Sequence, residues 1–127
     1  MSEYDRLERL VVEVYDKILD VAMMRYGPFT GPKVYIPRLN ETNWQEQFLP
    51  LKDSAKFYGV VFYGPKPFFS VNSWALTREM EIFGEDYVRD KVLETLCHEL
   101  VHRLKEGLSE VEVNIEGEKL RRLVKES

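Results

Sequence analysis

The sequence predicts an α+β fold in a single domain, residues 1–127, with an N-terminal helix, a small mixed or antiparallel sheet and C-terminal helices. Three observations predict it. Both ends of the chain carry apolar residues at helical spacing. Short runs rich in β-branched and aromatic residues lie between them. With 127 residues, 44% of them apolar, the chain can bury one core without disulfides, and no repeat or interdomain linker divides it.

The first predicted helix covers residues 4–24. Its apolar residues recur every three or four positions, with charged residues on the opposite face. These apolar residues are Leu7, Leu10, Val11, Val14, Ile18, Val21 and Ala22. Gly27 and Pro28 predict its end. Residues 33–37 (KVYIP) then predict a short strand, which the prolines place near an edge of the sheet because proline lacks an amide donor.

The sheet continues after a long connection over residues 38–56, which has no clear period and can shape a binding cleft. Residues 57–63 (FYGVVFY) and 67–72 (PFFSVN) predict two strands. The intervening residues 64–66 (GPK) have the composition of a turn, so the two strands are expected to form a hairpin.

Three helices are predicted after the sheet. Residues 74–83 form a short helix that ends at Gly84, and residues 86–106 form a long helix closed by Gly107. One broad apolar arc of the long helix faces the core: Leu93, Leu96, Cys97, Leu100, Val101 and Leu104. A capping box, Ser109 to Glu112, begins the final helix. The inward arc of that helix is Val113, Gly117, Leu120 and Val124, and its glycine is expected to permit a close helix approach.

The formal net charge of −4 lacks the cationic surplus of a typical nucleic-acid-binding protein. Cations near the C-terminus complement the negative end of a helix instead: Lys119, Arg121, Arg122 and Lys125. No apolar run approaches the length of a membrane span, and the charged N-terminus is unlike a signal peptide. The single cysteine, Cys97, fits a reducing compartment. We therefore expect a cytoplasmic protein with no nucleic-acid or membrane partner, and the oligomeric state stays open.

Both histidines of the chain lie in the motif HELVH, residues 98–102. His98 and His102 are four residues apart, so they project from one side of the long helix, away from its apolar arc, and both imidazoles can reach one ion. The pattern is short enough to occur by chance, which leaves a purely structural domain without a metal as one alternative. Its position in mid-helix after an apolar hairpin favours a metal site, and zinc prefers imidazole nitrogens as ligands.

Glu99 follows the first of these histidines and is rotated away from the ligand axis. It can therefore reach a zinc-bound water without binding the metal. Zinc lowers the pKa of such a water, and Glu99 would take its proton as the water attacks a carbonyl and return it to the leaving amine. The motif thus predicts Glu99 as the general base and acid.

A catalytic zinc site needs a third protein ligand, and no histidine remains. Cys97 points into the apolar arc and is assigned to core packing. Lys105 and Leu108 stand where the metzincin motif requires glycine and histidine, so that class is excluded. The final helix folds back beside the long one and returns to the level of His102 near position 110. The candidates on that helix are Glu110, Glu112, Glu116 and Glu118.

HELVH followed by a glutamate-bearing helix resembles the gluzincin-type zinc metallopeptidases in their smallest single-domain form, the minigluzincins. The pattern Glu110-x-x-Val113-Asn114-x-x-Gly117-x-x-Leu120 also resembles the E-x-x-A-N-x-x-A helix of ImmA/IrrE-type peptidases, whose first glutamate is the third zinc ligand. The resemblance covers residues 57–124 and implies a minimal zincin-like fold with Glu110 as the third ligand. Val113 replaces the usual alanine, and Glu116 stands where an aromatic is common, so Glu116 remains a second candidate.

In these families the strand before the active-site helix pairs with the substrate backbone, which would give this role to residues 68–73. An ordinary core and edge strand is an equally good interpretation. Tyr58, Tyr63 and Tyr87 are possible donors to an oxyanion, and none is assigned. The resemblance implies a zinc-dependent metalloendopeptidase that acts on a peptide or protein substrate. The alternative is a non-proteolytic zinc-binding regulatory or protein-interaction module that retains the motif.

Overall fold

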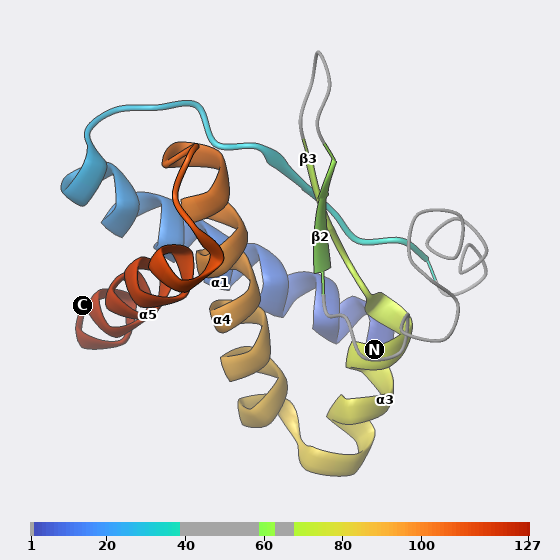
Figure 1. Ribbon diagram of the computed structural model, residues 1–127. Helices are drawn as coiled ribbons and strands as arrows, with labels where there is room; N and C mark the ends of the chain where they lie inside the picture. Colours follow the sequence, from blue (N-terminus) through green and yellow to red (C-terminus); the bar gives the residue numbers. More distant parts are fainter. Residues whose placement is uncertain (1, 39–58, 63–67) are drawn as a thin grey trace.

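The computed structural model describes residues 2–38, 59–62 and 68–127 (Figure 1). Along the chain the described elements are α1 (Glu3–Tyr26), β1 (Lys33–Tyr35), β2 (Gly59–Phe62), β3 (Phe68–Val71), α3 (Ser73–Phe83), α4 (Glu85–Leu104) and α5 (Glu110–Glu126). The described part of the chain is mostly helical with a small sheet, which confirms the predicted α+β class. The predicted connection over residues 38–56, apart from its first residue, and the predicted turn at 64–66 lie outside the described residues.

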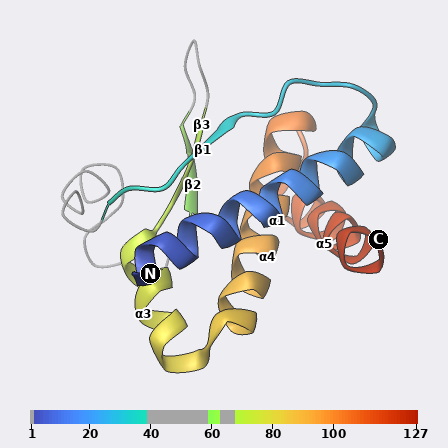
Figure 2. The same cartoon turned by 180° about the vertical axis from the view of Figure 1, so that it is seen from behind.

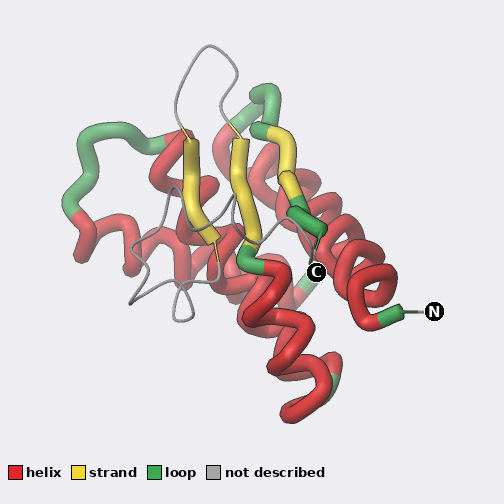
Figure 3. Tube along the Cα trace, turned by 90° about the vertical axis from the view of Figure 1, so that its right-hand side faces the viewer, coloured by secondary structure: helices red, strands yellow, loops and turns green. Residues whose placement is uncertain are grey.

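The sheet is mixed, with its strands in the order β1-β3-β2 (Figure 3). β2 runs antiparallel to β3, with Gly59 opposite Val71 and Phe62 opposite Phe68, which confirms the predicted pairing of these two strands. β1 runs parallel to β3 and lies at an edge of the sheet, as its prolines predicted. Such a parallel pair needs a crossover connection between its strands.

The expectation that residues 68–73 pair with a substrate is wrong for this strand. β3 ends at Val71 and lies in the centre of the sheet. Each residue from Phe68 to Ser70 pairs with β1 on one side and with β2 on the other. Because an added peptide needs a free strand edge, β3 cannot receive one along these residues.

The helices pack against one face of the sheet, and α1 runs across α3, α4 and α5 (Figure 2). Phe69 and Val71 of β3 are fully buried among the helices, and the ring of Phe69 meets that of Tyr15 edge-on at 6.0 Å. The predicted stripe of α1 is buried as expected, except that Val21 is only partly covered. Burying such large apolar side chains contributes about 1.5–3 kcal/mol each, so this layer holds the fold together.

Two tyrosines of α1 fix the chain that leads into and out of β1. The hydroxyl of Tyr4 donates to the carbonyl of Ile36 at 2.6 Å, and that of Tyr15 donates to the carbonyl of Pro32. Both carbonyls flank the short strand, so the tyrosines position it against the helix. Burial raises the pKa of Tyr15 above its usual value, which keeps this hydroxyl a donor.

The long helix α4 follows α3 after a single residue. Gly84, at φ 93°, ends α3 as predicted and precedes the first residue of α4. α4 ends at Leu104, two residues earlier than predicted, and Gly107 turns the chain after it at φ 92°. The predicted apolar arc is confirmed: Leu93, Leu96, Cys97, Leu100 and Val101 are buried, and Leu104 is partly buried. None of the described helices combines the length and the hydropathy needed to cross a membrane.

α5 returns along α4 (Figure 1). Its first turn is closed by the predicted capping box. The Ser109 hydroxyl accepts from the Glu112 amide at 3.2 Å, and the Glu112 carboxylate accepts from the Ser109 amide at 3.1 Å. The predicted inward arc, Val113, Gly117, Leu120 and Val124, is buried. The connection between the two helices is therefore short and defined at both ends, which fixes where α5 begins relative to α4.

Candidate metal centre

α4 presents its two histidines side by side on the face away from the core. Their Nε2 atoms lie 3.1 Å apart, and their ring centroids lie 4.7 Å apart. Each side chain is 27% exposed, so neither is a core histidine. This arrangement follows from the four-residue spacing, since residues i and i+4 of a helix lie one above the other.

Glu110, the first residue of α5, brings its carboxylate to both imidazoles. Oε1 lies 3.0 Å from the Nε2 of His98, and Oε2 lies 3.3 Å from the Nε2 of His102. The potential ligand atoms of these three residues all lie within 4.8 Å of one another. Among the described residues, this is the group of acid, histidine and cysteine side chains that can share one ion.

These three side chains fit a divalent cation as ligands. Each imidazole can donate a proton to Glu110, but two such donors 3.1 Å apart crowd each other. A cation instead draws the lone pairs of all three groups to one point. Ligands held about 2.0–2.1 Å from a tetrahedral zinc ion lie about 3.3 Å apart, close to the spacings observed here. Two imidazoles and one carboxylate are also a ligand set of known catalytic zinc sites.

The other three candidate acids of α5 are engaged elsewhere. Glu112 closes the capping box, and Glu118 pairs with Arg121 at 3.0 Å. Glu116, the second candidate ligand, accepts from Arg25 at 2.9 Å and from the Tyr26 hydroxyl at 2.6 Å. Arg25, and to a lesser degree Tyr26, lowers the pKa of Glu116 below its usual value. The structure thus brings Glu110, and not Glu116, to the histidines.

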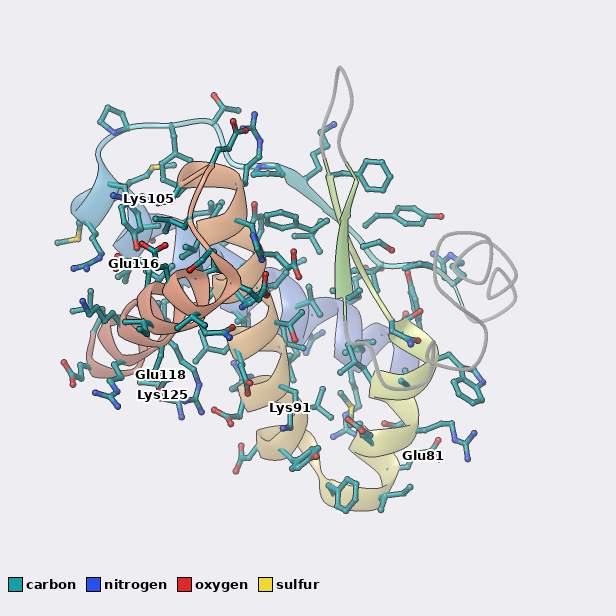
Figure 4. All side chains as sticks on the ribbon, viewed as in Figure 1. Glu81, Lys91, Lys105, Glu116, Glu118 and Lys125 are labelled. Carbon is teal, nitrogen blue, oxygen red and sulfur yellow. The ribbon has the colours of Figure 1, made fainter. Side chains whose placement is uncertain are left out.

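The contact of Glu116 with α1 was not foreseen from the sequence. Glu116 lies at the end of the helix pair where α1 finishes, with Lys105 close by (Figure 4). The ammonium of Lys105 lies 5.5 Å from the centre of the Tyr26 ring. Arg25 and Tyr26 occupy the last turn of α1, and no motif in the sequence marks them, because their role depends on where α5 lies in space.

Glu99 is partly buried beside the histidines. Burial raises the pKa of its carboxyl to about 7; the charge of His102 acts in the opposite direction, and Glu110 adds to the rise. Its electrostatic interactions with His102 and Glu110 indicate that Glu99 lies close to the candidate ligands. A cation bound there would lower this pKa, since a nearby positive charge favours the ionised carboxylate.

Two other sequence candidates lie away from the centre. Cys97 is buried in the core, and this burial raises the pKa of its thiol to about 12, which confirms its assignment to packing. Tyr87 packs against Phe83 at the start of α4, with the ring centroids 4.7 Å apart. Eleven residues of helix, about 16 Å, separate Tyr87 from His98, which places it outside the centre. Tyr58 and Tyr63 lie outside the described residues.

Comparison of the chain with protein-family models, with curated proteins and with solved structures finds no match.

Proposed function

We propose that this chain is a zinc-dependent metalloendopeptidase in which His98, His102 and Glu110 bind the ion. The observation that carries the proposal is the convergence of these three side chains from two helices, with Glu99 next to them. Three protein ligands are typical of a catalytic zinc site, because they leave a fourth position for water or substrate. A structural site usually has four protein ligands.

The exposure of the ligands supports a reactive site. The Glu110 side chain is 66% exposed, so the centre opens to solvent on the side of the α4–α5 connection. Glu110 also lies in the first turn of α5, where the helix dipole stabilises its negative charge. This exposure would let a peptide approach the proposed centre.

Glu99 is the proposed proton carrier. When bound, zinc would polarise a water molecule and the substrate carbonyl. Glu99 would accept the proton that the water loses as its oxygen attacks the carbonyl carbon. The same carboxylic acid would then give that proton to the departing amine nitrogen as the peptide bond breaks. Glu99 thus starts and finishes the cycle as a carboxylate.

The test is Glu99→Gln, which removes the proton carrier and keeps the shape of the side chain. We expect stoichiometric zinc to remain bound and hydrolysis of a quenched fluorescent peptide library to fall about 100- to 10,000-fold. Zinc is measured by elemental analysis of protein purified without a histidine tag. The matched control is Glu81→Gln, an exposed acid of α3 far from the centre (Figure 4), which should hydrolyse like the wild type.

Three results would count against the proposal. Full hydrolysis by the Glu99→Gln variant would refute the role of Glu99. A wild-type protein without zinc would favour a structural domain. Zinc in the wild type without cleavage of any peptide or candidate partner protein would favour the non-proteolytic zinc-binding module.

A further inference from the structure

At Gly117, α5 lies close against the backbone of α4. A Cβ atom placed on Gly117 would lie 3.4 Å from the Cα of His98, 3.7 Å from its amide nitrogen and 3.9 Å from the carbonyl carbon of Cys97. These are ordinary van der Waals distances to backbone atoms, which cannot rotate away. A methyl group therefore fits at this position, whereas any further atom that points toward α4 would overlap that backbone. The residue that Gly117 touches is itself one of the proposed ligands.

Contacts on both sides of Gly117 fix the rest of α5. Before it, Glu116 is held by Arg25 and Tyr26 of α1. After it, Arg121 makes two hydrogen bonds to Asp90 of α4, at 2.8 and 3.0 Å. The helix is thus anchored near its middle and beyond, whereas the side chain of Glu110, at the opposite end, is 66% exposed.

This arrangement makes the position of Glu110 sensitive to the distance between α5 and α4. At 1.5 Å per residue, Arg121 lies about 6 Å along the helix from Gly117 and about 16 Å from Glu110. If Arg121 acts as the pivot of a rigid helix, a displacement of about 1 Å at Gly117 becomes more than 2 Å at Glu110. Ligand distances in a zinc site tolerate only about 0.2 Å, so such a shift is large for the centre.

We propose that Gly117 is a positioning residue of the metal centre: its lack of a side chain sets the separation of α4 and α5 and thereby the reach of Glu110 to the ion. The inference rests on the metal site of the proposed function but not on peptide hydrolysis. It predicts that metal affinity depends on the size of residue 117 with a sharp threshold between a methyl group and anything larger.

The experiment compares Gly117→Ala with Gly117→Val by competition for zinc against a chromophoric chelator. The alanine variant should bind zinc within about twofold of the wild type, and its metal-free form should have a higher urea midpoint because alanine favours helix. The valine variant adds two carbons beyond the contact and should lose about 10- to 100-fold in zinc affinity, as when a group that orients a ligand is removed. The visible spectrum of the cobalt-loaded valine variant should also change, because it reports the ligand geometry.

Leu120→Ala is the matched control. It removes a buried side chain from the same face of α5, so it should lower the urea midpoint without pushing the helices apart. Zinc affinity of the folded Leu120→Ala protein should stay within about twofold of the wild type. This separates loss of stability from loss of position.

Zinc affinity of the valine variant within twofold of the alanine variant would overturn the inference, and so would an equal loss in both. If the valine variant does not fold, Gly117→Ser decides: it adds one atom beyond the contact, and affinity equal to that of the alanine variant would overturn the inference. A wild-type protein that binds no zinc would instead defeat the proposed function, so the two failures differ.

Discussion

The two ends of the α4–α5 pair differ in how their charged and polar side chains are arranged. At one end, Asp90 meets Arg121 and Lys125, each at 2.8 Å, so opposite charges satisfy one another. At the other end, the potential ligand atoms of His98, His102 and Glu110 all lie within 4.8 Å of one another. The first end is an ion-pair cluster that stabilises the fold, whereas the second is the proposed metal site. We therefore place the proposed function at the second end of the pair.

The largest expected effect is a loss of zinc affinity at the end of the pair that holds His98, His102 and Glu110. Glu110→Gln should lower zinc affinity at least about 100-fold, more than the loss expected when a group that only orients a ligand is removed. The metal-free protein should change in unfolding free energy by less than about 0.5 kcal/mol, because the Glu110 side chain is largely exposed. Chelator competition measures the first quantity, and urea unfolding in the presence of a strong chelator measures the second.

Glu116→Gln is the matched control, since Glu116 is the other acid that the sequence offered as a ligand. It should bind zinc as the wild type does and lose about 1 kcal/mol of stability with its bonds to Arg25 and Tyr26. The reverse pattern, with zinc lost in this variant and kept in Glu110→Gln, would exchange the roles of the two acids.

Substitution of Asp90 should have a smaller effect than that of Glu110, and it should lower stability instead of zinc affinity. Asp90→Asn removes the charge that faces Arg121 and Lys125, so we expect a loss of about 1 kcal/mol in unfolding free energy. Zinc affinity of the folded protein should not change by more than about twofold, because the asparagine oxygen can still accept a hydrogen bond from Arg121 and so keeps α5 in place. The control is Asp86→Asn, an exposed acid one turn earlier on α4, with an expected change of a few tenths of a kcal/mol. A large loss of zinc in Asp90→Asn would mean that the two ends are not independent.

The smallest effect concerns pH. Lys125, and after it Arg121, lowers the pKa of Asp90 in the folded protein below its usual value. The ionised carboxylate therefore stabilises the fold at every pH above the unfolded-state pKa of about 4, and this contribution is lost as the pH falls through the lower folded-state value. The stability difference between wild type and Asp90→Asn should accordingly be constant from pH 7 to about pH 5 and shrink below about pH 4. A difference that persists at pH 2 would show that the charge of Asp90 is not its cause.

Much of this molecule could be predicted from local patterns. The stripe of α1, the inward arc of α5 and the capping box at Ser109 depend on spacing within a single helix, and the structure confirms them. The histidine pair could be predicted for the same reason, since four residues of one helix fix its geometry. The position of Glu110 was harder, because it depends on a turn and on the packing of two helices.

What could not be predicted depends on long-range arrangement. Periodicity cannot tell that β3 lies between β1 and β2, because strand order follows from contacts between segments more than thirty residues apart. The same limit applies to Glu116, whose spacing allowed a ligand and whose actual partners, Arg25 and Tyr26, lie on the first helix. The sequence showed which acids were available, and the packing of three helices decided which one was free to meet the histidines.

The three proposed ligands lie within residues 98–110, after α1 and the whole sheet. A ribosome therefore makes every strand and the longest helix before it makes the first ligand. No nascent chain that stops short of Glu110 contains the complete set. The timing of synthesis alone thus withholds the proposed hydrolytic activity until the surrounding scaffold has been produced.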